Sequence, residues 1–181
     1  MLRKTRLLLT LGILFGAAWA GTFATFTDSG TASSAFTAGT VDLLISSEAD
    51  DAYSFTSLEM SNMKPGDVKY APLTVANNGS LSFGYSMSTS ATNTDSKGLR
   101  DQLTLGIRKV TATCDATTYA LAAGADILFA EAALSGGAIS SRTLASGNEI
   151  LCFKVLLPSG SGDSFQGATT TATFSFSATQ S

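Results

Sequence analysis

"TATFSFSAT", residues 171–179, alternates strictly between small polar and apolar side chains. Every second residue bears a hydroxyl group, and the residues between them are Ala172, Phe174, Phe176 and Ala178. This period of two is typical of a β-strand with one buried side and one side facing solvent. The pattern therefore predicts a half-buried strand, with the side chains of Phe174 and Phe176 both in the core.

The same alternation recurs earlier in the chain. Residues 149–157, "EILCFKVLL", are expected to form a strand whose apolar side consists of Leu151, Phe153, Val155 and Leu157. Cys152 and Lys154 fall on the opposite side, which the lysine marks as the wetter one. Further strands are expected at 38–46 and from residue 103 onward.

Turn signals separate these strands. Residues 69–90, "KYAPLTVANNGSLSFGYSMSTS", contain Asn78-Gly79 between two strand-like runs, which predicts a β-hairpin. Pro65-Gly66 predicts a type II turn. At Arg108-Lys109 the alternation changes phase, which suggests a bulge. Residues 124–136 are ambiguous between strand and short helix.

These features together predict the fold class. The chain has 181 residues, of which only 14% are charged, and it contains 17 glycines and 3 prolines. About eight short strands, with turns between them and no βαβ spacing, indicate an all-β protein with at most one short helix. We expect residues 38–181 to form one β-sandwich of the jelly-roll or Greek-key type.

The N-terminus resembles an export signal. Arg3, Lys4 and Arg6 precede the apolar run "LLLTLGILFGAAWA", and small-residue cleavage patterns end at Ala20 and at Ala24. The alternative is a membrane anchor over residues 7–26, since twenty residues just span a bilayer. Glycines and threonines dilute this stretch, so the sequence favours a secreted protein that signal peptidase cleaves.

The chain without its leader is acidic. Removing the three basic residues of the leader from the 11 of the whole chain leaves 8 basic against 14 acidic residues, a net charge of −6. Neutralising nucleic-acid phosphates requires clustered lysine and arginine, and the sequence has no such cluster after the leader. Nucleic acid is therefore not expected as a partner.

Cys114 and Cys152 are the two cysteines of the chain. In an exported protein such a pair is expected to form a disulfide, and two buried free thiols are the alternative. The sequence lacks CxxC spacing and has no histidine nearby, so a metal site built on these cysteines is not expected.

The sequence offers no candidate catalytic residues. It has no histidine, so neither a Ser-His-Asp triad nor an HExxH metal motif can be built. The loop with Glu48, Asp50 and Asp51 lacks the spacing of a calcium loop, and solvated charges explain it better. We expect no enzyme activity and no cofactor. Asn78 begins a glycosylation sequon, although the turn alone accounts for it.

Several stretches, in the same order along the chain, resemble blocks of the TasA/camelysin family of secreted biofilm-matrix fibre proteins. They are "GTFATFTDSGTASSAFTAGTVDL" (21–43), "NMKPGDVKY" (62–70), "VANNGSLSF" (75–83) and "FSFSATQ" (174–180). The ordered set carries the resemblance, which spans nearly the whole chain. Residues 90–140 match poorly, and the cysteine pair departs from the family pattern.

The resemblance implies a structural subunit whose jelly-roll domains join head to tail into extracellular fibres. It implies cleavage after Ala24, which makes Thr25 the new N-terminus. Residues 25–37 would then add as a strand to the neighbouring subunit, with Phe26 and Phe36 as apolar anchors. The implied partners are further copies of the chain and an accessory protein that anchors the fibre.

Two other functions stay open at this point. The chain could be a monomeric cell-surface adhesin, in which residues 25–37 fold onto their own domain or stay disordered. It could also be a metallopeptidase, as camelysin was classed, but the missing histidines argue against a zinc site.

Overall fold

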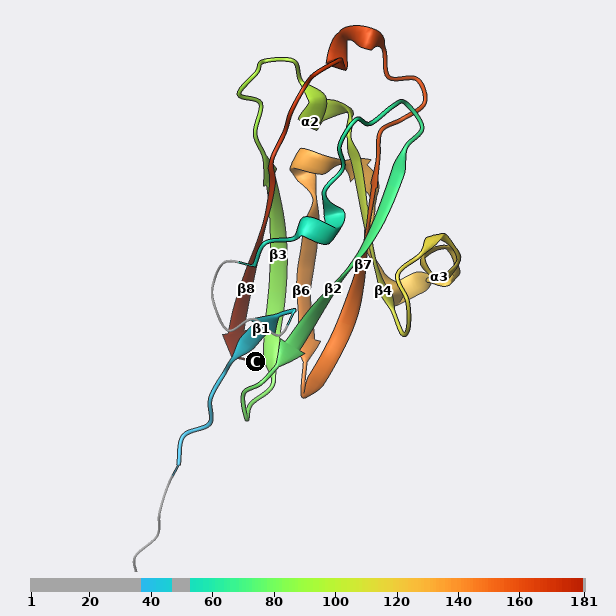
Figure 1. The fold of residues 1–181 in the computed structure, drawn as a ribbon. Helices are drawn as coiled ribbons and strands as arrows, with labels where there is room; N and C mark the ends of the chain where they lie inside the picture. Colours follow the sequence, from blue (N-terminus) through green and yellow to red (C-terminus); the bar gives the residue numbers. More distant parts are fainter. Residues whose placement is uncertain (1–36, 47–52, 181) are drawn as a thin grey trace, which may run out of the picture. The chain divides into compact units, whose positions relative to one another are not determined.

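Eight strands, counted over residues 37–46 and 53–180 that this computed structural model describes, form two antiparallel sheets (Figure 1). The larger sheet has the order β1 (Leu43–Ile45), β2 (Val68–Asn77), β7 (Gly147–Leu156), β4 (Thr104–Val110), β5 (Ile127–Ala133). The smaller sheet has the order β6 (Ala138–Leu144), β3 (Phe83–Ala91), β8 (Ala172–Gln180). Five of the seven connections between the described strands cross from one sheet to the other, as connections do in Greek-key sandwiches. The predicted fold class is confirmed.

The core lies between the inner faces of the two sheets. Alternate residues of β2, β3, β4 and β7 point inward. The following residues among them are each at most 3% exposed: Leu73, Val75, Phe83, Tyr85, Met87, Leu105, Ile107, Leu151 and Phe153. The period of two in the sequence therefore corresponds to the face that each strand buries.

Two short α-helices occur in the described ranges, where the sequence predicted at most one. They are α2 (Leu99–Gln102) and α3 (Ala116–Leu121). The ambiguous stretch 124–136 instead contains a 3₁₀ turn (Gly124–Asp126), strand β5 and a second 3₁₀ turn (Leu134–Gly136). Pairing of β5 with β4 decides this stretch, because tertiary pairing overrides a weak local preference for helix.

The hairpin predicted at Asn78-Gly79 is wrong. The strands before and after it, β2 and β3, belong to different sheets, so residues 78–82 cross from one sheet to the other. The inner faces of β2 and β3 are both apolar and meet across the core, which direct pairing would prevent. Asn77 shapes this crossing, because its side-chain amide donates to the carbonyl oxygens of Leu81 and Leu144 at 2.8 and 3.1 Å.

The predicted turn at Pro65-Gly66 and the predicted bulge at Arg108-Lys109 have different outcomes. The Pro65-Gly66 turn is confirmed, with Gly66 at a φ of 96° and Asp67 N donating to Lys64 O at 3.0 Å. The bulge predicted at Arg108-Lys109 is wrong in position, because β4 stays in register with β7 as far as Val110. The irregularities lie between Leu105 and Arg108, in the pairing of β4 with β5.

Strand β8 has the predicted alternation, but Phe174 and Phe176 are only half-buried. Phe174 packs edge-on against Phe153 and Phe55, with ring centroids 5.0 and 6.0 Å apart. Strand β8 lies at the edge of its sheet and pairs with β3 on one side, and no described strand pairs with its other side. The missing neighbour leaves the apolar face of β8 incompletely covered.

Candidate functional site

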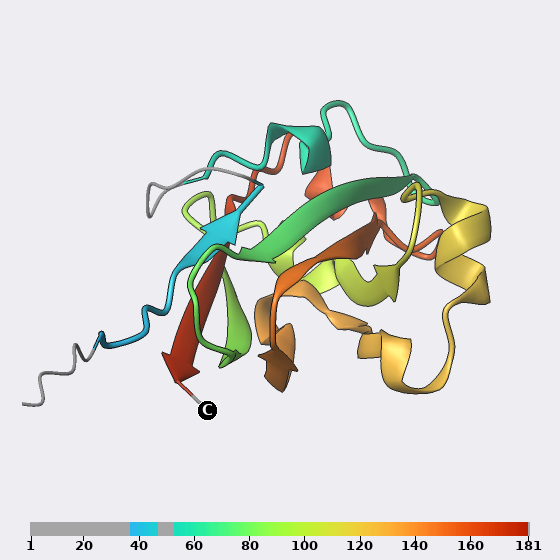
Figure 2. The ribbon, with the colours of Figure 1, turned by 90° about the horizontal axis from the view of Figure 1, so that it is seen from below.

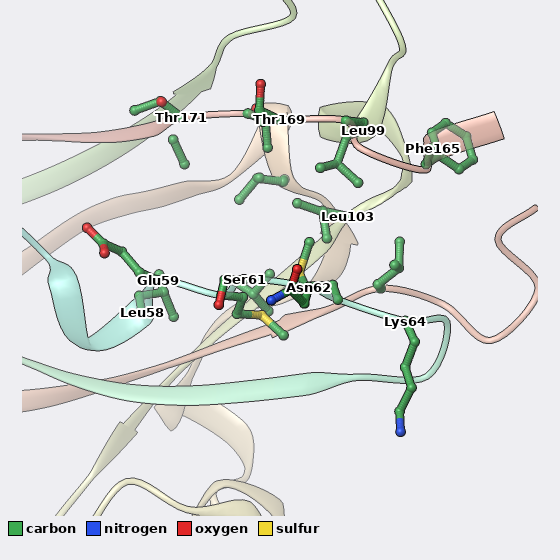
Figure 3. Close-up of a pocket in the computed structure, with 18 of the residues that line it drawn as sticks. Leu58, Glu59, Ser61, Asn62, Lys64, Leu99, Leu103, Phe165, Thr169 and Thr171 are labelled. Atoms are coloured by element: carbon green, nitrogen blue, oxygen red, sulfur yellow. The ribbon is translucent and has the colours of Figure 1, made fainter. Parts of the chain in front are cut away.

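A groove of about 960 Å³ opens beside the start of β8 (Figure 3). One wall is residues 53–65, which include the 3₁₀ turn Thr56–Leu58. The other wall is residues 162–174, which include the 3₁₀ turn Asp163–Phe165 and the first residues of β8. Figure 3 shows Thr169 and Thr171 across the groove from Leu58, Glu59 and Ser61.

The floor of the groove is apolar, whereas polar side chains such as Glu59, Asn62 and Gln166 also line the groove. Its floor consists of the buried residues Leu99, Leu103, Leu134, Val155 and Leu157. Half-buried apolar side chains extend the floor onto the walls, namely Tyr53, Phe55, Leu58, Met60, Met63, Phe165, Ala168, Ala172 and Phe174. An apolar cavity that is open along one side suits an apolar occupant.

Hydrogen bonds from two side chains to backbone groups hold the wall beside β8 in place. The carboxylate of Asp95 accepts hydrogen bonds from Thr169 N at 2.7 Å and from Lys97 N at 3.0 Å. The bond from Thr169 is the main reason why the pKa of Asp95 lies below its ordinary value, and the bond from Lys97 adds to it. Lys97 Nζ donates to Gln166 O at 2.8 Å, which fixes the same wall at a second point.

The chain enters the sandwich at the opposite end of β8. Thr40 O accepts from Ser80 N and Leu81 N at 3.0 and 3.1 Å, in the crossing between β2 and β3. That crossing leads into Phe83, which pairs with Gln180 at the end of β8, whereas Ala172 at its start pairs with Ala91. The groove and the entry of the chain are therefore at opposite ends of β8 (Figure 1).

The sequon residue Asn78 lies in the crossing beside this entry. Its side chain is exposed and donates to Asp42 Oδ2 at 2.8 Å. Gly79 fits here because a Cβ would collide with Thr40 O, not because of a positive φ. A contact with residues 40–42 thus explains Asn78-Gly79 better than the expected hairpin turn does.

The structure contains the disulfide expected from the sequence, between Cys114 and Cys152, with Cα atoms 5.2 Å apart. It attaches the excursion between β4 and β5, residues 111–126 with helix α3, to the outer face of the larger sheet (Figure 2). The side of β7 expected to be wetter is covered there, so Cys152 is fully buried. Val110 and Tyr119 belong to the same small apolar cluster.

Tyr119 is the centre of this outer cluster. Arg108 Cζ lies 4.3 Å from the centroid of its ring, and Lys154 Nζ lies 5.6 Å from it. Burial, and next the charge of Glu131, raise the pKa of Tyr119 to about 12. Its hydroxyl has no hydrogen-bond partner among the described residues and lies directly over Gly106.

Replacing Gly106 with alanine is expected to cost about 2 kcal/mol of unfolding free energy, because the new Cβ would collide with the Tyr119 hydroxyl. Tyr119→Phe removes a hydroxyl without a partner and should be nearly neutral. In that background Gly106→Ala should cost less, and the remaining cost comes from the approach of the new Cβ to Glu131 Cγ, which belongs to a flexible side chain. Urea unfolding of the four proteins measures the coupling, and an equal cost of Gly106→Ala in both backgrounds would contradict this account.

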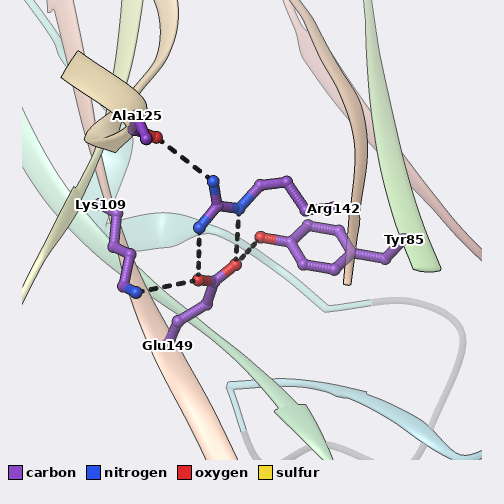
Figure 4. Close-up of polar contacts among 5 residues, drawn as sticks. All are labelled: Tyr85, Lys109, Ala125, Arg142 and Glu149. Atoms are coloured by element: carbon purple, nitrogen blue, oxygen red, sulfur yellow. Dashed lines mark hydrogen bonds and ion pairs between the residues drawn. The ribbon is translucent and has the colours of Figure 1, made fainter. Parts of the chain in front are cut away.

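A polar cluster around Glu149 connects the two sheets through the core (Figure 4). Glu149 of β7 is 8% exposed and accepts from Arg142 of β6 at 3.2 Å (Nε) and 3.0 Å (Nη2). The hydroxyl of Tyr85 in β3 also donates to Glu149, and Lys109 Nζ of β4 lies 3.7 Å from it. Every group of this cluster has a partner, so we interpret it as a structural link.

Neither the groove nor this cluster was predicted from the sequence. The groove forms from loops that come together only in the fold, and nothing in residues 53–65 alone signals it. The sequence does contain a sign that Glu149 is buried. Glu149 lies two and four positions before Leu151 and Phe153, so its side chain falls on the apolar side of the same strand. A charge at such a position indicates a buried partner.

Other predicted positions lie outside the described residues. They are the cleavage site at Ala24 and Thr25, the anchors Phe26 and Phe36, and the acidic stretch with Glu48, Asp50 and Asp51. Within the described ranges, no helix combines the length and the apolar composition that crossing a membrane requires.

A family model described as camelysin metallo-endopeptidase matches residues 7–109, which is more than half of the chain. The chain therefore belongs to the TasA/camelysin family. The match ends within β4, before the residues between β4 and β5 that the disulfide holds. A search among curated proteins finds no match.

The family description implies a metal, so we asked whether the residues fit one. The sequence has no histidine, and both cysteines are in the disulfide. In the part of the chain that the structure describes, no three acidic or cysteine side chains come together as a metal would require. These residues do not fit a catalytic zinc ion.

Proposed function

We propose that this member of the TasA/camelysin family is a secreted structural subunit, which forms extracellular fibres by giving its N-terminal segment to the next subunit. The observation that carries the proposal is the edge of β8 with which no described strand pairs, beside a groove with an apolar floor. An unpaired edge exposes N–H and C=O groups that accept a further strand. The groove would receive the apolar side chains of that strand.

The direction of the chain supports donation to a neighbour. Residues 37–42 lead away from the sandwich at the Gln180 end of β8 (Figure 1). If residues 25–36 turned back onto β8 of their own domain, they would run parallel to it. Every described strand pair is antiparallel, and parallel pairing is slightly less stable. The β8 of another subunit can receive the segment antiparallel.

The spacing of the two anchors also supports this occupant. Phe26 and Phe36 are ten positions apart, so both fall on the same side of an extended strand. Ten residues of strand cover about 33 Å, which is comparable with the nine residues of β8. The side chains between the two anchors on that side are short, namely Asp28, Gly30, Ala32 and Ser34, so the Phe26 and Phe36 rings are the apolar contacts that this side offers, and the charge of Asp28 must stay in contact with water.

Cleavage of the leader would act as the switch for assembly in this scheme. An uncleaved leader holds residues 25–37 at the membrane, where they cannot reach a neighbour. We further propose that the protein is not a peptidase, since its sequence has no histidine and no group of described side chains fits a catalytic zinc ion. Further copies of the chain are its main partner, and an accessory matrix protein would anchor the fibre.

The test compares the chain that starts at Thr25 with a variant lacking residues 25–34. Electron microscopy should show filaments of the first, and size-exclusion chromatography should show a folded monomer of the second. The deletion variant can accept a strand but cannot donate one. When it is mixed in at a low ratio, it should therefore end filaments early and shorten them in proportion to its fraction.

A matched pair of variants tests the anchor. Phe26→Asp places an unpaired charge in an apolar slot and should abolish or strongly weaken assembly. Thr27→Asp adds the same charge on the opposite side of the strand and should assemble nearly normally. Filaments of the deletion variant would refute donation, and a monomeric parent chain would favour an adhesin. Chelator-sensitive cleavage of casein by pure protein would favour a peptidase.

A further inference from the structure

The methionines of the described residues divide into two groups. Met87 is 3% exposed in the centre of the core. Met60 and Met63 are half-buried, and both line the groove on the wall formed by residues 53–65. The remaining methionine of the sequence is Met1, in the leader. Methionines that solvent can reach therefore coincide with the groove.

No free thiol competes with them for an oxidant. The chain has two cysteines, and both are in the disulfide. The single tryptophan is Trp19, which is also in the leader. A mild peroxide should therefore react first with the two thioethers of the groove wall, because oxidation of methionine follows exposure.

We propose that Met60 and Met63 are oxidation sites that close the groove to the incoming strand. This inference rests on the proposed function. In the reaction the thioether sulfur attacks one oxygen of a peroxide, the O–O bond breaks, and water leaves. Sulfur loses two electrons and becomes a sulfoxide, while the peroxide is reduced. The product is polar, and it replaces two of the apolar side chains with which this wall borders the apolar floor of the groove.

Because Met60 and Met63 line the groove, oxidation should affect strand binding, and strand binding should in turn affect oxidation. A thioether is flexible and polarisable, so a wall that contains two of them can adapt to an incoming strand. A sulfoxide on this wall is desolvated without a hydrogen-bond partner where a phenylalanine anchor of the incoming strand covers it. An occupied groove also shields both sulfurs, so filaments should oxidise more slowly than free subunits.

The experiment treats the chain that starts at Thr25 with dilute hydrogen peroxide, and maps the products by peptide mass spectrometry. Met60 and Met63 should each gain one oxygen, whereas Met87 should stay unmodified. The concentration needed for filament growth should rise about tenfold, which corresponds to about 1.4 kcal/mol. The urea unfolding midpoint should change less than filament growth does, because both side chains are only half-buried at the margin of the core.

The double variant Met60→Leu/Met63→Leu is the matched control. It keeps the groove apolar and should form filaments equally well before and after peroxide. Equal filament growth of oxidised and unoxidised parent protein would overturn the inference, and so would oxidation of Met87 at the rate of Met60. If unoxidised protein forms no filaments at all, the proposed function fails and the inference fails with it.

Discussion

Replacing Glu149 with glutamine is expected to lower the free energy of unfolding by about 3 kcal/mol, at the lower end of the range for breaking a buried ion pair. Glutamine keeps the shape of the side chain but loses its charge. Its amide group would then face the guanidinium of Arg142, donor against donor. The side chain of Arg142 is 24% exposed, so water offsets part of the loss.

The same substitution at Glu131 is the control. Glu131 pairs with Lys154 at 2.8 Å, but 36% of its side chain is exposed. Exposed pairs contribute at most about 1 kcal/mol, so Glu131→Gln should have a much smaller effect. Urea unfolding at pH 7 measures both variants, and equal losses would mean that the cluster around Glu149 is not a structural link.

The contribution of Glu149 should depend on pH in a defined direction. Burial by itself raises the pKa of Glu149, but hydrogen bonds from Arg142 and Tyr85 outweigh burial and hold the pKa below its ordinary value. A carboxyl with a lowered pKa stabilises the fold at pH values above its unfolded pKa, and this stabilisation is lost as pH falls through the folded value.

The stability difference between the parent protein and Glu149→Gln should therefore be constant above about pH 5 and narrow below about pH 4. Tyr85 stays a donor throughout this range, because burial and then Glu149 raise its pKa. Unfolding curves between pH 3 and pH 7, about the range in which carboxyls titrate, measure the difference. A gap that stays constant over this whole range would mean that Glu149 titrates normally in the fold.

The sequence was informative wherever burial alternates along one strand. Residues 171–179 and 149–157 were both identified as strands, because one side of each faces the core. Burial on both sides defeats this logic. Val110 is buried on the outer side of β4, in the cluster under α3, although the strand itself is unbroken there. An apolar residue on the outer side made the alternation look as if it changed phase at Arg108-Lys109, which is why a bulge was predicted.

Long-range pairing was harder to predict than local structure. Asn78-Gly79 did connect two strands, but a turn signal cannot tell whether these strands pair or face each other across a core. Similarly, Gly106 is required by the Tyr119 hydroxyl, which comes from another element thirteen residues later. The groove depends on loops whose positions only the complete sandwich fixes.

Loss of the disulfide should cost still more than the change at Glu149. Cys114 and Cys152 are 38 positions apart, and closing a loop of that length stabilises the fold by about 4 kcal/mol in the chain-entropy model. Cys114→Ala removes the cross-link and leaves Cys152 packed against Val110 and Tyr119. Cys152→Ala also leaves a small cavity, so we expect it to lose about 1 kcal/mol more.

Reductant separates the cross-link from packing. In the presence of dithiothreitol, the parent protein should unfold at the urea concentration of Cys114→Ala, while that variant should not respond to reductant. The sheets should still form, because most of the core lies between them and not under α3. Free thiols in the denatured, unreduced protein, or equal stability of the reduced and oxidised parent, would show that the excursion is held by the packing of Tyr119 instead.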